Sequence, residues 1–248
     1  MIATPGFRRR GRTAGHDDIA AALGGEILAG VRPPGSRMPS ADELFERFGA
    51  SRMLLREVTK TLAAKGLITA KSRIGTHVLP PEHWNWFDSD VLSWRVQRGL
   101  DRDFLHHLSQ MRRSVEPGAA ALAARHRTAA HLAEMRAALA AMARARTDRR
   151  AFAQADLDFH IAVATASGNP LFRSFATVVE TALGAFFSLS TPIEDSAKAA
   201  IVARHAEIAD AIEAGDPEAA ARKMLAVIDQ GVERVMPGSH DAEAVSRP

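Results

Sequence analysis

Asp156, His160 and His205 are the residues of this chain whose types and spacing favour metal chemistry. Asp156 and His160 lie four residues apart, so on a helix their side chains share one face. His205 falls on a predicted apolar stripe with Ile201 and Ile208, and a buried imidazole needs a polar partner. One carboxylate and two imidazoles suit Zn²⁺, Ni²⁺, Mn²⁺ or Fe²⁺. The simpler alternative is a core histidine that is hydrogen-bonded to Asp156.

Arg52, Arg56 and Lys60 have the chemistry of DNA recognition. On a helix that begins after Ser51, they fall within an arc of about 80°, at about 100° per residue. A helix in the major groove needs such a face, because arginine pairs with guanine edges and both cations neutralise phosphates. The alternative is an ordinary amphipathic helix with a solvated basic face. The opposite, apolar face carries Leu54, Leu55, Val58 and Leu62.

The segments around this basic helix predict a helix-turn-helix. Apolar spacing predicts a first helix over residues 16–30. Ser40 opens a short second helix that ends at Gly49, and Ser51 caps the third helix, which runs to about Lys65. The short second helix, the turn at Gly49 and a basic hairpin further along the chain strengthen the DNA-binding interpretation, and Ser51 joins the candidate DNA contacts.

Two short apolar runs that flank residues 71–75 predict a β-hairpin with a basic tip that contains glycine. We expect Lys71 and Arg73 to touch phosphate or the minor groove from this wing, with Gly75 in the same contact region. Together with the three helices, the hairpin predicts a winged helix-turn-helix domain over residues 16–79.

The rest of the chain predicts a second, all-α domain, so the fold class is mainly α. Helical patterns dominate residues 94–236 without strand-like alternation, which indicates a helical bundle. Residues 80–93 are expected to form an irregular linker, and the tryptophans within residues 84–94 to join the two domains by aromatic burial. Residues 1–15 are expected to be a disordered basic arm and residues 237–248 a disordered tail.

The composition excludes several classes of protein. The chain has 248 residues, of which 46% are hydrophobic, enough to bury the core of one or two domains. The absence of cysteine excludes disulfides, thiolate zinc sites and cysteine nucleophiles, and it fits a reducing cytoplasm. No apolar run approaches the roughly 20 residues of a membrane span, so no membrane partner is expected. Residues 1–80 hold 13 Lys and Arg against 7 Asp and Glu, and residues 81–248 hold 19 against 22, so the first third is expected to meet a polyanion.

A series of short motifs runs through residues 16–79: Pro34-Gly35, Met38-Pro39-Ser40, Glu43-Leu44, Ser51-Arg52, Arg56-Glu57-Val58, Gly66-Leu67-Ile68 and Gly75-Thr76. Together they resemble the winged-helix signature of the GntR family of transcriptional regulators. The resemblance implies a homodimer that binds a palindromic operator in double-stranded DNA. This chain departs from the family after the Pro-Ser step, where Ala41 and Asp42 replace the usual glutamate and basic or polar residue. Asp42 would repel phosphate.

A second series of motifs runs through the helical region: Arg112-x-x-x-Glu116, Asp156-x-x-Phe159-His160, Asn169-Pro170 and His205-x-x-Ile208. They resemble the FCD ligand-sensing domain of the FadR subfamily over about residues 90–235. In metal-binding members, one Asp and three His hold the ion at the floor of an effector cavity, and Asp156, His160 and His205 match three of these positions. The fourth histidine should fall at Val227, so effector oxygens or water would complete the coordination shell.

The same resemblance implies a small carboxylate as the effector. The family arginine at the position of Arg112 commonly binds the effector carboxylate, and Glu116 and Asn169 are the further candidate effector residues. The alternative for Arg112 and Glu116 is a plain salt bridge between residues four apart. The tryptophan-rich linker, with Val115-Glu116-Pro117, resembles the sugar-acid regulators that include the galactonate operon repressor. This implies an aldonate or a related hydroxy acid.

The sequence therefore predicts a cytoplasmic, homodimeric transcription regulator, a repressor of a catabolic operon that a sugar acid releases from its operator or alters on it. Its expected cofactor is a divalent metal, Zn²⁺ before Ni²⁺, Mn²⁺ or Fe²⁺. One alternative is a metal-dependent enzyme that uses Asp156, His160 and His205 on a small hydroxy acid, although the chain has no hydrolase, phosphate-loop or dinucleotide motif. The other alternative is a basic scaffold that binds nucleic acid without an effector.

Overall fold

The computed structural model describes residues 14–71, 75–99, 101–145, 148–189 and 195–236. Contacts between residues divide the chain into two units, with the division after Gly99, and each unit is described by itself. The expectations for residues 1–13 of the basic arm, for the tail at 237–248 and for Arg73 lie outside the described residues.

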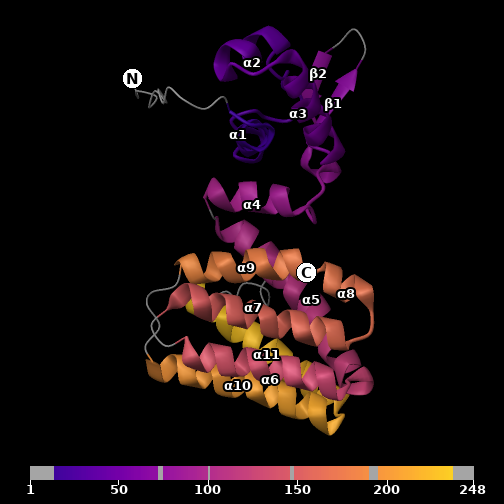
Figure 1. The fold of residues 1–248 in the computed structure, drawn as a ribbon, viewed down its shortest axis with the longest axis vertical. Helices are drawn as coiled ribbons and strands as arrows, with labels where there is room; N and C mark the ends of the chain where they lie inside the picture. The colour runs from indigo at the N-terminus through magenta and orange to yellow at the C-terminus, as the bar shows by residue number, and fades with distance from the viewer. Residues whose placement is uncertain (1–13, 72–74, 100, 146–147, 190–194, 237–248) are drawn as a thin grey trace, which may run out of the picture. The chain divides into compact units, whose positions relative to one another are not determined.

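The first unit is a winged helix-turn-helix, as predicted (Figure 1). Its two strands form one antiparallel hairpin in which Ile68 pairs with Val78. Residues 81–83 form a single 3₁₀ turn after this hairpin. The described elements are α1 (His16–Leu28), α2 (Ala41–Phe48), α3 (Arg52–Ala64), β1 (Ile68–Lys71), β2 (Gly75–Val78), η1 (Pro81–His83) and α4 (Ser89–Gln97).

The helix-turn-helix is shaped by three small residues. Ser40 caps α2, because its hydroxyl accepts from the Glu43 amide at 3.3 Å and the Glu43 carboxylate accepts from the Ser40 amide at 2.6 Å. Gly49 ends α2 with φ +65°, a left-handed conformation that glycine adopts without strain. Ser51 then caps α3 by accepting from the Leu54 amide at 3.2 Å. These caps set the angle at which α3 follows α2.

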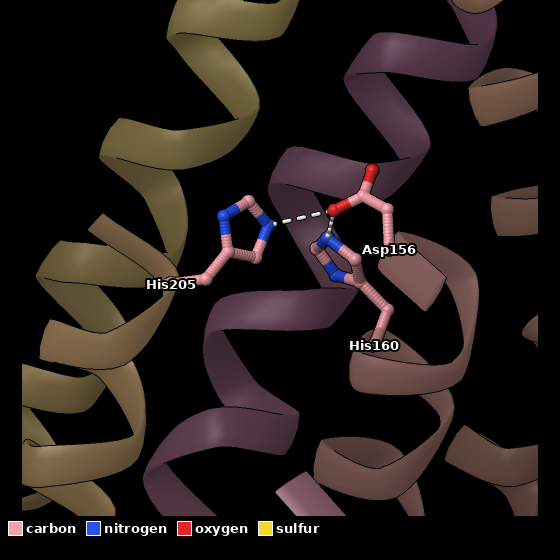
Figure 2. A group of neighbouring side chains, drawn as sticks. All are labelled: Asp156, His160 and His205. Atoms are coloured by element: carbon pink, nitrogen blue, oxygen red, sulfur yellow. Dashed lines mark ion pairs between the residues drawn. The ribbon is translucent and has the colours of Figure 1, made fainter. Parts of the chain in front are cut away.

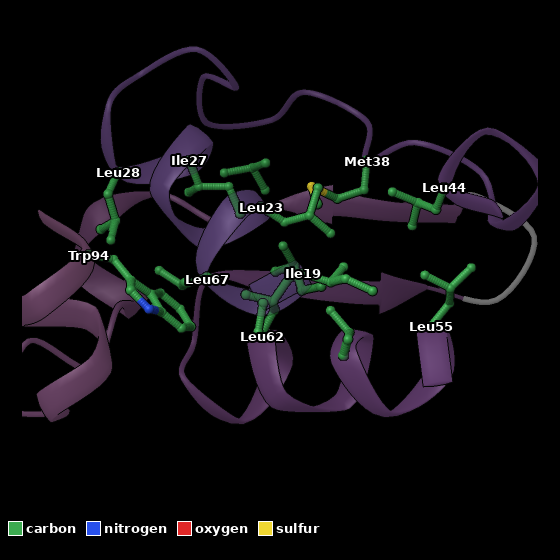
Figure 3. Packing of buried hydrophobic residues seen from close by; sticks show 14 of the residues in the cluster. Ile19, Leu23, Ile27, Leu28, Met38, Leu44, Leu55, Leu62, Leu67 and Trp94 are labelled. Atoms are coloured by element: carbon green, nitrogen blue, oxygen red, sulfur yellow. The ribbon is translucent and has the colours of Figure 1, made fainter. Parts of the chain in front are cut away.

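The core of this unit joins α1, α3, the hairpin and α4. Figure 3 shows Ile19, Leu23, Leu62 and Leu67 pointing into one apolar cluster that also holds the ring of Trp94. Each of these four aliphatic residues is at most 1% exposed, so burial of this cluster is a main source of stability for the unit.

Helix α4 packs against α1 rather than standing in a linker. A Cβ atom at Gly24 of α1 would lie 2.3 Å from the ring of Trp94, so only glycine allows this close approach. Residues 94–99 were expected in the helical domain, whereas their contacts place them with the first unit. The tryptophans expected to bury between domains all pack against the first unit's core: Trp94 inside it, Trp84 and Trp86 partly buried on it.

Glu26 ties α1 to the segments that follow it. Arg32 Nε donates to Glu26 Oε2 at 2.6 Å, and Arg47 of α2 donates to the other carboxylate oxygen. Burial by itself raises the pKa of Glu26, but the hydrogen bonds and charges of Arg47 and Arg32 outweigh it and lower the pKa below its ordinary value of 4.5. The ionised carboxylate therefore stabilises the folded unit.

The substitution Glu26→Gln is expected to reduce the free energy of unfolding by about 1 kcal/mol at pH 7, a modest value because Arg47 is partly exposed. Because the pKa of Glu26 is lowered on folding, its contribution is full above pH 4.5 and is lost as the pH falls through the folded value. The difference in melting temperature between the wild type and the variant should therefore shrink toward zero in acid. The exposed neighbour Glu46→Gln is the control, and a difference that stays constant with pH would contradict this role.

The second unit is an all-α bundle (Figure 1). Helix α5 lies at its centre and contacts α7, α9, α10 and α11. No helix among the described residues is both long and apolar enough to cross a membrane. The elements are α5 (Arg102–His126), α6 (Ala129–Arg144), α7 (Arg149–Ala166), α8 (Pro170–Ser174), α9 (Ala176–Leu189), α10 (Asp195–Ala214) and α11 (Pro217–Val235).

One break interrupts the helical segment that follows Asn169. The α-helix is interrupted at Phe175. The Phe175 amide donates to the Phe172 carbonyl at 3.2 Å, so this hydrogen bond spans three residues instead of the four of an α-helix. The break separates α8 from α9 and leaves Phe175 8% exposed in the apolar interior. Burial of the Phe175 ring stabilises the fold more than an uninterrupted helix would. The hydrophobic periodicity of the sequence does not predict this break.

Candidate functional site

Asp156, His160 and His205 meet in the interior of the helical unit (Figure 2). Asp156 and His160 lie one turn apart on α7, and His205 comes from α10, 45 residues later in the chain. Their exposed fractions are 5%, 4% and 2%. One candidate ligand atom from each residue lies within 4.8 Å of the others, so the structure brings together the set that the sequence singled out.

The contact between His205 and Asp156 brings a ring nitrogen and a carboxylate oxygen together in the interior. His205 Nδ1 lies 2.8 Å from the Ile201 carbonyl oxygen, which can only accept, so Nδ1 carries the proton and donates. When the ring carries no second proton, it presents a lone pair at Nε2, 2.8 Å from Asp156 Oδ1. Both atoms are buried, and neither has a hydrogen-bond partner in the described residues. A metal ion or a second imidazole proton would satisfy them, so the donor set fits a divalent cation.

His160 is held by a carboxylate on another helix. Glu116 of α5 lies against His160 Nδ1, and Arg112 Nε donates to the second Glu116 oxygen at 2.6 Å. This leaves His160 Nε2 facing Asp156 Oδ1 at 3.9 Å. A carboxylate behind a histidine fixes the ring and its tautomer in many metal sites. Glu116 is therefore placed to orient His160.

The charges of this buried group support one another. Burial by itself raises the pKa of Glu116, but the charges of Arg112 and His160 outweigh it and lower the pKa to about 2. Burial likewise raises the pKa of Asp156, and the charges of His205 and His160 outweigh it and lower that pKa. Both carboxylates are therefore ionised at neutral pH.

A cavity of about 60 Å³ opens onto this group, with room for roughly four to six water molecules. Arg112, which is 2% exposed, reaches the cavity from α5. Val227 lines it from α11, at the position where the family resemblance puts a fourth histidine. The cavity therefore combines a buried guanidinium with the Asp and His side chains, which is the chemistry that binds a carboxylate.

Two other predicted effector residues do not line this cavity. Glu116 lies behind it and holds Arg112 and His160. Asn169 caps α8, where its side-chain oxygen accepts from the Leu171 amide at 3.0 Å. A strong N-cap explains the Asn-Pro pair without a ligand.

Arg204 and Arg234 also line the cavity, although no motif in the sequence singled them out. Arg204 precedes His205 on α10, and Arg234 lies two turns after Val227 on α11. That spacing of seven residues was a usable signal, because it places Arg234 on the helix face of the expected fourth ligand. Three arginines and one carboxylate give the cavity a cationic lining.

The predicted recognition helix presents its basic residues outward. The side chain of Arg52 is 79% exposed, and its guanidinium lies 3.0 Å from the carboxylate of Asp42 on α2. Lys60, 66% exposed, pairs with Glu57 one turn earlier. Arg56 is also exposed and has no hydrogen-bond or ion-pair partner in the described part of the chain. All three cations are accessible, while Leu55 and the rest of the apolar face pack inward.

The other predicted DNA contacts have mixed positions. Ser51 is exposed and caps α3, so its hydroxyl is partly engaged. Lys71 is the last residue of β1, and Gly75 opens β2 with φ +94°. Their backbones place both at the tip of the hairpin, with Arg73 outside the described residues.

Two family models match the chain. The model of the gntR family of bacterial regulatory proteins matches residues 16–78, and the FCD domain model matches residues 107–230. FCD domains can bind metal, in agreement with the buried Asp and His group. The two matches coincide with the winged helix-turn-helix and with most of the helical bundle.

Two relatives from Escherichia coli K12 are each 33% identical to this chain. The galactonate operon transcriptional repressor matches over 88% of this chain and 96% of its own, and the uncharacterised HTH-type regulator YieP over 85% and 90%. Among solved structures, the Listeria monocytogenes protein Lar matches with a TM-score of 0.61 at 16% identity over 91% of this chain and 98% of its own. That likeness concerns the fold alone.

These matches overturn the alternative of a metal-dependent enzyme. The gntR model describes bacterial regulatory proteins, and the two relatives that match over most of both chains are named as transcriptional regulators. The chain belongs to the gntR family of bacterial regulatory proteins, in the FadR-type group that carries an FCD domain, and it is a DNA-binding transcriptional regulator.

Proposed function

We propose that this protein is a cytoplasmic, homodimeric repressor of a catabolic operon and that a small sugar acid releases it from its operator. The observation that carries the proposal is the cationic cavity, in which the buried Arg112 lies beside Asp156, His160 and His205. A carboxylate with neighbouring hydroxyl groups satisfies both a guanidinium and a metal-binding group. The galactonate repressor, which is similar over most of both chains, favours an aldonate.

In this proposal the first unit binds the operator through its winged helix-turn-helix domain, residues 16–79. Helix α3 enters the major groove with Arg52, Arg56 and Lys60, and Ser51 approaches phosphate at its N-terminus. The wing contributes Lys71, Arg73 and Gly75. Two copies related by a two-fold axis would place two α3 helices on the two half-sites of a palindrome.

The helical domain senses the effector, with a divalent metal as its resident cofactor. Asp156, His160 and His205 would hold the ion, and Zn²⁺ is preferred because its ligands are imidazoles and a carboxylate. When bound, the ion supplies positive charge and open coordination positions for oxygen. Arg112 binds the effector carboxylate, and Glu116 holds Arg112 in place. Effector and operator influence each other only if the effector binds the DNA-free and DNA-bound states unequally.

The effector proposal is tested by gel shift with DNA from upstream of the protein's own gene. Galactonate is expected to release the wild-type protein, and Arg112→Lys is expected to need at least tenfold more, because lysine cannot pair with a carboxylate through two parallel hydrogen bonds. The control Arg222→Lys changes an exposed arginine of α11 whose guanidinium pairs with Glu218. Operator binding that no sugar acid alters would contradict the effector, and equal response of both variants would contradict the role of Arg112.

A further inference from the structure

Arg204 and Arg234 form a pair of like charges at the outer part of the effector cavity. They come from neighbouring helices, α10 and α11, and both line the cavity whose inner wall holds Asp156 and His205. Both arginines are exposed, whereas the inner residues are at most 5% exposed. The cavity therefore leads from the buried Asp and His group toward two guanidinium groups.

Neither arginine has a hydrogen-bond or ion-pair partner within the described ranges of the chain. Other arginines of this bundle are paired between helices. Arg113 of α5 donates to Asp229 of α11 at 2.6 Å, and Arg136 of α6 donates to Asp210 of α10 at 2.7 Å. These two arginines therefore have acidic partners on neighbouring helices, whereas Arg204 and Arg234 have none among the described residues.

The Arg204 guanidinium is close enough to Arg234 to disfavour the charge of Arg234. Partial removal from water lowers the pKa of Arg234, and the Arg204 cation lowers it further, while Asp156 opposes the change. Arg234 stays charged at neutral pH because the ordinary pKa of arginine lies so high. An anion placed between them would remove this repulsion.

The charges that line the cavity leave a surplus of positive charge. Arg112 is already matched by Glu116 at 2.6 Å. Among the described residues, Asp156 is the one carboxylate that lines the cavity, and it can offset only one of the two charges of Arg204 and Arg234. A ligand with a single carboxylate at Arg112 would leave the other positive charge without a counterpart.

We propose that the effector is a hydroxy acid with a second anionic group, which Arg204 and Arg234 bind together at the outer part of the cavity. This rests on the proposed function, in which the first carboxylate lies near Arg112. The second group is a carboxylate or a phosphate, and both offer several oxygens to two guanidinium forks. The ligand class is thus a sugar dicarboxylate or a phosphorylated sugar acid.

The test is isothermal titration of the full-length protein, loaded with Zn²⁺, with three acids of the same carbon skeleton: galactonate, galactarate and 6-phosphogalactonate. At least one of the two acids with a second anionic group is expected to bind tenfold to a hundredfold tighter than galactonate, because a hydrogen bond to a charged group contributes that much to affinity. Which of the two gains more identifies the second group as carboxylate or phosphate.

Arg204→Gln is expected to bring this affinity ratio close to one, and Arg234→Gln to lower it as well. Arg222→Gln, on α11 outside the cavity lining, should keep the wild-type ratio and serves as the matched control. Galactonate binding without a gain from either second anionic group would overturn this inference and leave the proposed function standing. A ratio that survives in Arg204→Gln would also overturn it, and failure of all three acids to bind would count against both.

Discussion

The double variant Arg52→Ala/Arg56→Ala is expected to bind operator DNA at least 100-fold more weakly than the wild type. Each arginine is exposed on one face of α3, and a good arginine–guanine contact is worth about 1–3 kcal/mol. The two free-energy losses add, so the fold-changes in affinity multiply. Fluorescence anisotropy with labelled DNA from upstream of the protein's own gene measures the change. The plot of log affinity against log salt concentration should also become shallower by up to roughly 1.8, if both residues also neutralise phosphates.

The matched control is Arg222→Ala/Lys223→Ala, which removes the same charge from α11 of the helical unit. It should change operator affinity little. Operator binding that is unchanged in the α3 double variant would contradict the assignment of this helix to the major groove.

The two single variants should differ, because the structure pairs Arg52 and leaves Arg56 available. Asp42 lies 3.0 Å from Arg52 and partly neutralises its charge. Arg52 therefore contributes less electrostatic attraction to DNA than Arg56 does. We expect Arg56→Ala to weaken binding more than Arg52→Ala. Asp42→Ala should strengthen binding to unrelated DNA, since it removes the repulsion between a carboxylate and phosphate.

The second large effect concerns metal. Zn²⁺ at about 100 times its dissociation constant should stabilise the wild type by about 2.7 kcal/mol, which corresponds to a rise in melting temperature of roughly 5–10 °C. His205→Ala should abolish this rise, because it removes the Nε2 lone pair that faces Asp156 Oδ1 at 2.8 Å. Thermal unfolding with and without a chelator measures it, and the control is His107→Ala, an exposed histidine of α5.

Loss of His205 also leaves a cavity, which destabilises the protein whether or not metal binds. The variant Val227→His separates the two effects, because Val227 lines the same cavity from α11 and a histidine there adds a ligand. We expect it to bind Zn²⁺ at least tenfold tighter than the wild type. A wild type that Zn²⁺ does not stabilise, together with a Val227→His variant that binds it no better, would show that a proton rather than a metal lies between Asp156 and His205.

Local chemistry predicted much of this molecule. The helix-turn-helix depends on local interactions, because each cap or turn formed by Ser40, Gly49 and Ser51 involves residues only a few positions away. Cap and turn preferences that are visible in the sequence therefore predict it. The pairing of Asp156 with His160 on one face follows in the same way from the 3.6-residue period of α7. For His205, an apolar stripe predicted burial but not its neighbour.

Tertiary packing decided the rest. The 2.8 Å approach of His205 to Asp156, the position of Glu116 behind His160 and the convergence of Arg204 with Arg234 each join helices that are distant in sequence. The same holds for Trp94, whose burial against Gly24 assigns α4 to the first unit. The physical reason is that periodicity fixes the direction of a side chain around its own helix axis. Which neighbour it meets depends on how helices pack, and that is set by the shape and burial of all their apolar faces together.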